Sequence, residues 1–593
     1  MIFGKSINRY YLKNIVFIIL GVFALVVEDY LMLQAPRMYR MAVNGLTTGF
    51  VTEGGATYAF DMDFLFYKIC FPLIVFILLM AVGRFFWRIM FFGVSIRAEE
   101  DLRNRMFDRA RYLSVQYYSD NKIGGVMSLF TNDLDTVNEC IGYGMVLTAD
   151  ATIMGALAVS KMWNMNPVLT VYCMIPMGVL LITAVWVGRY MSEKWRVRQE
   201  AFSRLSDFTQ ERFSGISVIK AFVKETVEMM SFKKLNMENE TANVKHTKAS
   251  VLMRVLVTLF VQSIVSVILG YGGYLVYRGE FDAGQLVEFI GYFTSVVFPV
   301  MSVSELINLS SQGKSSLQRI EELLDARQDV IDASDAKPVE EIKGEIQFKE
   351  LTFRYPGSDR DVLKNISFTI EAGQKVGIVG RSGCGKTTVV DLLLRTYNVP
   401  DGTVFVDGQD INTLKIHDLR QNFAYVPQDN FLFSDTIESN IAFGVETVED
   451  AEVHRVAILA DVDANIREFS KGYKTVLGER GVTVSGGQKQ RISIARALMK
   501  DAPVLIMDDS VSAVDTKTEK IILENMHLVR QNKTTILIAH RISTVEGMDK
   551  ILFVDNGELI AQGSHEELLE SCPDYRLLVR LQKLEEEGGE EDA

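Results

Sequence analysis

Nine residues, Gly380 to Thr388 (GRSGCGKTT), carry the clearest chemical pattern in this chain of 593 residues. The apolar run Val376 to Val379 before them predicts a buried strand, and Val389 to Leu394 predict a helix packed on it. Glycines in the stretch allow a tight turn that brings backbone N–H groups against phosphate oxygens, and the helix adds its positive dipole end. A chance glycine-rich turn is the alternative. The flanking strand and helix favour a phosphate-binding loop.

Two side chains of this loop are expected to act directly on a nucleotide. Lys386 adds a positive charge near the outer phosphates, and the Thr387 hydroxyl is a ligand for Mg²⁺. The loop residues expected to bind the nucleotide are Gly380, Arg381, Ser382, Gly383, Cys384, Gly385, Lys386, Thr387 and Thr388. Alkylation of the Cys384 thiol is expected to crowd the phosphates and to block nucleotide binding.

Further candidate residues occur along the second half of the chain. Tyr355, in FRYPG, is placed to stack on an adenine ring, and Gln428, in YVPQDNFLF, to reach the metal or the attacking water. The apolar stretch VLIMDD ends in two carboxylates, of which Asp508 is expected to hold Mg²⁺ and Asp509 to orient water as the catalytic base. His540, after another apolar strand, is expected to contact a terminal phosphate. Taken singly, Tyr355 would more often be a core residue and His540 a structural one.

A second anion site is predicted at the stretch VSGGQ, which opens a helix that continues through QRISIARAL. Adjacent glycines at a helix start leave backbone N–H groups exposed to an anion. The residues assigned to this site are Ser485, Gly486, Gly487 and Gln488.

The first half of the chain contains six long apolar stretches, each about as long as the twenty or so residues that cross a bilayer. They are Asn14 to Leu33, Phe64 to Met90, Ile141 to Met162, Val168 to Gly188, Leu252 to Val276 and Leu286 to Leu309. The connections at residues 84–140 and 189–250 are rich in Arg and Lys, which places them and the N-terminus in the cytoplasm. Their charges have helical spacing, so the spans are expected to continue as cytoplasmic helices.

Ionisable residues inside membrane spans are costly and mark candidate functional positions. Glu28 and Asp29 lie in the first span, and Glu288 and Glu305 in the sixth. One hypothesis is that they line a path for cationic ligands. The alternative is that they cap helices, lie at interfaces or pair with arginine.

The domain organisation follows from these patterns. Residues 1–325 are expected to form an all-α membrane domain of six helices with long cytoplasmic extensions, followed by a linker at residues 326–343. Residues 344–580 alternate short β-rich runs with helices and predict an α/β ATPase domain around a largely parallel sheet, before an acidic tail at residues 581–593. The net charge of −13 argues against a nucleic-acid partner, and the five cysteines show no CxxC pair or metal-ligand spacing.

Together, the phosphate-binding loop, Gln428, VSGGQ, Asp508, the stretch SAVD and His540 resemble the ATPase domain of ABC transporters. With six spans ahead and LGERG at Leu477 to Gly481, residues 1–580 are similar to an exporter-type half-transporter of the cell membrane. The resemblance implies ATP and Mg²⁺ as cofactors, a cytoplasmic ATPase domain and coupling elements at Gln116 to Gly125 and Ser214 to Ala221. It also implies a second half-transporter, whose ATP the signature residues Ser485 to Gln488 contact.

The chain departs from this family at Asp509, where active members usually have Glu. Asp is one methylene shorter, so ATP is expected to bind here and to hydrolyse slowly. In this respect the chain resembles the weak-site subunit of heterodimeric bacterial multidrug exporters, which move amphipathic drugs, lipids or peptides. Two alternatives stay open: a homodimer in which Asp509 suffices, and a regulatory or channel-type membrane protein that ATP only gates.

Overall fold

The computed structural model describes residues 5–53, 56–339, 341–478, 481 and 484–591. The chain divides into two compact units. One comprises residues 1–111 and 123–326, and the other comprises residues 112–122 and 327–593. The second unit thus combines the C-terminal part of the chain with a short segment from the first half.

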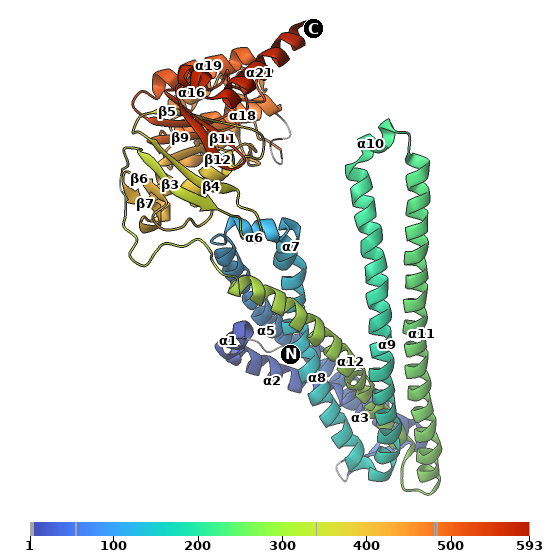
Figure 1. Ribbon diagram of the computed structural model, residues 1–593. Helices are drawn as coiled ribbons and strands as arrows, with labels where there is room; N and C mark the ends of the chain where they lie inside the picture. The colour runs from blue at the N-terminus through green and yellow to red at the C-terminus, as the bar shows by residue number, and fades with distance from the viewer. Residues whose placement is uncertain (1–4, 54–55, 340, 479–480, 482–483, 592–593) are drawn as a thin grey trace. The chain divides into compact units, whose positions relative to one another are not determined.

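The first unit is almost entirely helical (Figure 1). Its helical stretches long and apolar enough to cross a membrane are Ile15–Thr48, Met62–Ala110, Ile123–Met165, Pro167–Ser214, Glu225–Tyr277 and Ala283–Asp325. The six predicted spans are therefore confirmed, and each continues beyond its apolar run. The elements are α1 (Lys5–Lys13), α2 (Ile15–Met32), α3 (Ala35–Thr48), β1 (Phe50–Glu53), β2 (Ala56–Ala59), α4 (Met62–Phe64), η1 (Leu65–Cys70), α5 (Phe71–Ala110), α7 (Ile123–Ser128), η2 (Leu129–Asp133), α8 (Leu134–Met165), α9 (Pro167–Ser214), α10 (Ile216–Ala221), α11 (Glu225–Tyr277) and α12 (Ala283–Asp325).

The helix boundaries follow from local sequence. At the start of α9, Asn166 caps the helix by accepting a hydrogen bond from the Leu169 backbone N–H at 2.9 Å, and Pro167 occupies the first helical position. Gly215 ends α9 and α10 follows at once. Helices α9 and α11 lie side by side as a long hairpin with α10 at its tip (Figure 1).

The second unit contains two sheets. The larger has the strand order β12-β11-β5-β10-β9-β8, with parallel pairing from β11 to β8 and an antiparallel edge at β12. The smaller is antiparallel, in the order β4-β3-β6-β7. The predicted parallel sheet is present, and the first predicted strand of this half belongs to the separate antiparallel sheet. Buried apolar side chains of β5, β9 and β10 hold the parallel strands in the core.

The strands of the second unit are β3 (Ile346–Phe353), β4 (Leu363–Ile370), β5 (Lys375–Val379), β6 (Val404–Val406), β7 (Gln409–Asp410), β8 (Phe423–Val426), β9 (Val504–Asp508), β10 (Thr534–Ile538), β11 (Lys550–Asp555) and β12 (Glu558–Gly563). Its helices are α6 (Val115–Asp120), α13 (Lys386–Leu393), η3 (Ile411–Thr413), α14 (Ile416–Gln421), α15 (Ile437–Ile441), η4 (Ala442–Gly444), α16 (Asp450–Leu459), α17 (Asp463–Glu468), η5 (Gly472–Lys474), α18 (Gly486–Met499), α19 (Thr516–Val529), α20 (His565–Ser571) and α21 (Pro573–Glu591). The last helix continues into the acidic segment predicted from residue 581.

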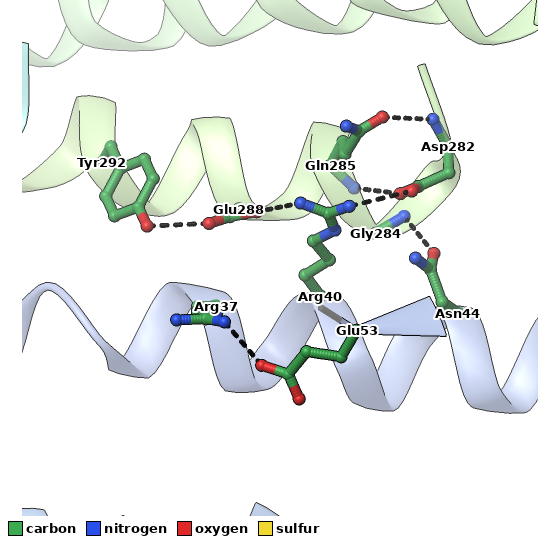
Figure 2. A network of polar contacts seen from close by, with 9 residues as sticks. All are labelled: Arg37, Arg40, Asn44, Glu53, Asp282, Gly284, Gln285, Glu288 and Tyr292. Atoms are coloured by element: carbon green, nitrogen blue, oxygen red, sulfur yellow. Dashed lines mark hydrogen bonds and ion pairs between the residues drawn. The ribbon is translucent and has the colours of Figure 1, made fainter. Parts of the chain in front are cut away.

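A polar network joins the outer ends of the first and sixth spans, where α3 packs on α12 (Figure 2). Arg40 of α3 contacts Glu288 at 3.2 Å and Asp282 at 3.5 Å. Tyr292 donates a hydrogen bond to the other carboxylate oxygen of Glu288 at 2.7 Å. The two helices approach closely at Gly284, because an added Cβ there would lie 2.5 Å from the Arg40 carbonyl oxygen. The network therefore needs both the charge of Arg40 and a residue without a side chain opposite it.

We expect Arg40→Ala to destabilise the protein, because the Glu288 side chain is only 7% exposed and would lose its guanidinium partner. A buried polar group left without its partner costs about 1–3 kcal/mol, and a charged group costs more. Thermal unfolding of the purified protein measures the change. The matched control is Arg37→Ala, which removes an exposed arginine one turn away that pairs with Glu53; it should have little effect. Equal losses in the two variants would contradict the assigned importance of Glu288.

Candidate functional site

The predicted phosphate-binding loop connects the central strand β5 to α13. Backbone φ angles are +77° at Gly383 and +102° at Gly385, a region that favours glycine. Gly380 is needed for a different reason, because an added Cβ would lie 1.9 Å from the carbonyl oxygen of Val554 on β11. Close packing against the neighbouring strand thus fixes where the loop leaves the sheet.

Lys386 is held within this loop. Its ammonium group donates hydrogen bonds to the carbonyl oxygens of Gly380 at 2.9 Å and Arg381 at 3.0 Å. The residue is buried at the first position of α13, whose backbone N–H groups point out of the helix start. A positive charge and the N-terminal end of a helix therefore lie together, and this arrangement favours binding of an anion.

A cavity of about 280 Å³ brings the loop together with most of the other predicted site residues. Strands β8, β9 and β10 are parallel neighbours, so the side chains that follow their carboxyl ends meet at one edge of the sheet. The lining residues are Tyr355, Val362, Ser382, Gly383, Gly385, Lys386, Thr387, Thr388, Gln428, Asp508, Asp509, Ile538 and His540.

Asp508 ends β9 inside this cavity. Burial raises the pKa of its carboxyl group, and the neighbouring Asp509 adds to the rise, while a hydrogen bond with Thr387 opposes it. Its Oδ2 atom is buried and receives no hydrogen bond from the described residues. Burial also raises the pKa of Asp391, on α13, to about 6, and Asp508 contributes to that rise. A carboxylate with an unused oxygen beside a threonine hydroxyl, in a site with excess negative charge, fits a divalent cation with oxygen ligands.

Asp509 has a left-handed backbone with φ +46°. Its backbone N–H donates to the carbonyl oxygen of Ile538 at 2.9 Å, and its own carbonyl oxygen accepts from Gln490 at 3.4 Å and from Ser512 at 2.9 Å. Gln490 lies on α18, the helix opened by the glycine pair of VSGGQ, and also accepts a hydrogen bond from the Ala513 backbone. Gln490 was not predicted from the sequence, because a glutamine inside an amphipathic helix carries no sign that it is buried.

His540 follows β10, and a side chain of the C-terminal helix α21 contacts the backbone around it. Gln582, on α21, donates to the carbonyl oxygen of His540 at 2.6 Å and accepts from the Ile542 backbone N–H at 2.8 Å. Gln582 thus holds the loop after β10, and it was not predicted from the sequence because only the tertiary fold brings residue 582 to this loop.

Tyr355 lies at the cavity with its ring edge-on to two other aromatic rings, Phe353 at 5.2 Å and Tyr397 at 5.0 Å between centroids. Its hydroxyl group is 2.9 Å from the Thr388 hydroxyl oxygen, and burial raises the pKa of the phenol. These contacts fix the ring beside the phosphate-binding loop. The adenine-stacking role stays a prediction.

The residues of the second predicted anion site do not line this cavity. Ser485 caps α18 through a reciprocal pair of hydrogen bonds with Gln488, at 3.3 Å and 3.0 Å. Gly486 and Gly487 form the first turn, and an added Cβ at Gly486 would meet no atom within 4 Å. The helix start is therefore open to an approaching group. Of LGERG, Glu479 and Arg480 lie outside the described residues.

Three predicted loop residues also lie outside the cavity lining: Gly380, Arg381 and Cys384. Gly380 shapes the turn, Arg381 is exposed and the Cys384 side chain is buried. Burial raises the pKa of the Cys384 thiol, although Lys386 acts in the opposite direction.

The four acids predicted along the substrate path have different environments. Glu28 accepts hydrogen bonds from Arg84 at 2.8 Å and from the Trp87 indole, and Glu288 pairs with Arg40 as described above. Glu305 is exposed and contacts the Tyr143 hydroxyl. Asp29 is buried, and one of its carboxylate oxygens has no hydrogen-bond donor among the described residues.

The fold and this cavity define a membrane domain of six helices fused to a nucleotide-binding α/β domain of the transport ATPase type. Residues 18–300 match the ABC transporter transmembrane region and residues 363–512 match the ABC transporter domain. The chain belongs to the ABC transporter family and is a multi-pass membrane protein with a cytoplasmic ATPase domain.

Among its relatives is the probable multidrug resistance ABC transporter ATP-binding/permease protein YheI of Bacillus subtilis, which is 36% identical over 99% of this chain and 98% of its own length. The multidrug resistance-like ATP-binding protein MdlA of Escherichia coli is 32% identical over 95% of this chain and 93% of its own length. A structure of a bacterial Atm1-family ABC exporter with ATP bound superposes with a TM-score of 0.78 at 27% identity, covering 97% of this chain and 98% of the other. The protein is therefore an ABC exporter.

Alkylation of Cys384 should be slow near neutral pH and should accelerate as the pH rises. A raised thiol pKa leaves less thiolate at pH 7 to 8 than an ordinary cysteine has, and the thiolate is the reactive form. Iodoacetamide labelling of a variant that retains only this cysteine, compared with the same protein unfolded in urea, measures the effect. Once labelled, the protein should no longer bind ATP. Fast labelling in the folded protein, or unchanged ATP binding afterwards, would contradict the expectation.

Proposed function

We propose that this chain is one subunit of an ATP-driven exporter of amphipathic compounds and that it works with a second half-transporter. The observation that carries the proposal is the separation of its two predicted anion sites. The 280 Å³ cavity contains the phosphate-binding loop and Asp508, whereas Ser485 to Gln488 do not line it. A second subunit would supply the missing signature residues, and the open start of α18 would serve that subunit's own site.

Residues at the cavity fit ATP and Mg²⁺. Lys386 and the N-terminus of α13 would bind the phosphates, and the unused oxygen of Asp508 would hold the metal with Thr387 and Gln428. Bound ATP supplies a phosphoanhydride bond whose hydrolysis releases free energy. His540 would contact the terminal phosphate, its loop held in place by Gln582.

Asp509 is proposed to make this site slow. Its carboxylate is one methylene shorter than that of glutamate, and its backbone is anchored at both the N–H and the C=O. The side chain therefore cannot gain reach by a shift of the main chain. A misplacement of about 1 Å lowers the rate of a catalysed step by roughly a hundredfold. A heterodimer follows, in which this site retains ATP and the partner's site performs most of the turnover.

Two short helices are proposed to couple ATP binding to the membrane domain. Helix α6 (Val115–Asp120) belongs to the ATPase unit, where the Ser114 hydroxyl donates to the Asp329 carboxylate at 2.9 Å. The second short helix is α10 (Ile216–Ala221), at the tip of the α9–α11 hairpin. Directly after it, the side chains of Phe222 and Val223 are 70% and 80% exposed. Exposed apolar side chains at the end of a long hairpin favour contact with another protein domain, which in the proposed assembly is an ATPase domain.

The substrate class is proposed from the relatives. YheI of Bacillus subtilis is named as a probable multidrug resistance transporter and MdlA of Escherichia coli as multidrug resistance-like. This chain shares their length and domain order, which supports export of apolar or amphipathic small molecules.

We expect Asp509→Glu to raise the ATP turnover of the complex purified with its native partner, because the longer side chain restores reach. Asp509→Asn should leave that turnover within about twofold, because the partner's site dominates. The matched control is Asp501→Glu. Asp501 is an exposed aspartate that does not line the cavity, and its backbone has the same φ of +46°. Steady-state phosphate release measures all three variants.

Two results would overturn the assignment. One is the loss of turnover in the Asp509→Asn complex. The other is brisk ATP hydrolysis by this chain purified alone, which would indicate a homodimer in which Asp509 is sufficient.

A further inference from the structure

A polar cavity of about 710 Å³ lies within the membrane unit, apart from the nucleotide site. Helices α7, α8, α9 and α12 and the π-helical turn η2 each contribute residues to its lining. Apart from Gly125 and Leu129, every lining residue has a polar side chain. Ligand cavities are usually lined mainly by apolar side chains, so this one suits a polar group.

Three spans place this cavity at a similar depth. Thr136 precedes the apolar run of the third span by five residues, Gln312 follows that of the sixth by three, and Gln199 follows that of the fourth by eleven. At a rise of 1.5 Å per residue, these side chains lie about 5 to 17 Å beyond the apolar runs, on the cytoplasmic side. This is the level of the lipid head groups and of the water next to them.

The two charged side chains of the lining neutralise each other. Arg319 donates hydrogen bonds to both carboxylate oxygens of the buried Asp133, one of them at 3.3 Å from Nε. It also donates to the hydroxyl groups of Ser315 at 3.1 Å and Ser316 at 3.2 Å. A charged ligand would therefore lose water here without gaining an unpaired counter-ion, which is costly.

The other polar groups of the lining are carboxamides and hydroxyls. The side chains of Asn132 and Gln199 make no hydrogen bond with the residues that the structure describes. Gln312 donates to Asn308 at 3.4 Å, and its carbonyl oxygen accepts no hydrogen bond from those residues. A carboxamide has both donors and an acceptor, so it pairs well with a hydroxyl group, which also donates and accepts.

We propose that this cavity binds the uncharged, hydroxyl-bearing head group of the exported compound, whose apolar part lies between the spans. The inference rests on the proposed export function and narrows its substrate to non-ionic amphiphiles. Neutral lining selects against ionic head groups, and the depth of the cavity matches the boundary between the polar and apolar parts of such a molecule. Turn η2 supplies Leu129, Asn132 and Asp133, and π-helical turns are frequent at functional sites.

The test is equilibrium binding of radiolabelled amphiphiles to the complex with its native partner in lipid nanodiscs without nucleotide. Dodecyl maltoside has an uncharged hydroxyl-rich head, and dodecyltrimethylammonium and dodecyl sulfate combine the same chain with a positive and a negative head. Empty nanodiscs give the background from partition into lipid. Dodecyl maltoside should bind saturably above this background and about tenfold more tightly than either charged probe.

Gln199→Leu and Gln312→Leu should each weaken binding of dodecyl maltoside by about threefold to tenfold, because each removes a hydrogen bond to an uncharged partner. Binding of the charged probes should not change, which also shows that the variants are folded. The matched control is Gln318→Leu. Gln318 lies on the same helix, α12, pairs with Glu322 at 3.2 Å and does not line the cavity, so this variant should bind all three probes normally.

Three results would overturn the proposal: no saturable binding of dodecyl maltoside, tighter binding of a charged probe, or an equal loss in Gln318→Leu. Because nucleotide is absent, none of them depends on whether Asp509 makes the ATP site slow. ATP-driven uptake of dodecyl maltoside into inside-out vesicles tests the export function separately. Intact binding without such uptake would contradict export of this compound and leave the binding site standing.

Discussion

The parallel pairing of β5, β8, β9 and β10 is the constraint on which the nucleotide site depends. Parallel neighbours end at the same edge of a sheet, so loops separated by more than 150 residues, such as those at Lys386 and His540, meet in one cavity. The close approach of Gly380 to the Val554 carbonyl oxygen fixes the loop on this edge. Hydrogen bonds from α18 and α21 then hold the Asp509 and His540 loops. The ATPase unit is thus built around one sheet edge and stabilised from helices distant in sequence.

The same arrangement supports the proposal that this chain works with a second half-transporter. The signature residues form the start of α18. One turn further along the same helix, Gln490 donates a hydrogen bond to the Asp509 carbonyl oxygen. The side of α18 that supports the chain's own catalytic loop is therefore distinct from the helix start that would face another subunit's nucleotide. In the proposed assembly this would give a physical route from one nucleotide site to the other, because movement of α18 would also move the loop that contains Asp509.

In the membrane unit, the partners of the buried charged residues distinguish one acid from another. Burial of Glu28 and Glu288 is matched by an arginine in each case, so these acids stabilise contacts between spans. One carboxylate oxygen of Asp29 has no hydrogen-bond donor among the described residues, although Asp29 is adjacent in sequence to Glu28. Neighbouring residues on a helix point in different directions by about 100°, which is why two adjacent acids have different partners.

The sequence by itself determined the six spans, their orientation, the α/β class of the ATPase domain and most of the residues that line the candidate cavity. Those features depend on local patterns: apolar length, hydrophobic period, and glycines and charged residues at fixed spacing. Tertiary structure alone decided the rest. It separated Ser485 to Gln488 from the cavity, excluded the Cys384 side chain from its lining, and brought Gln490 and Gln582 to the catalytic loops. It also distinguished Asp29 from Glu28, because whether a buried charge is compensated depends on residues from other helices, and no spacing within one segment records that.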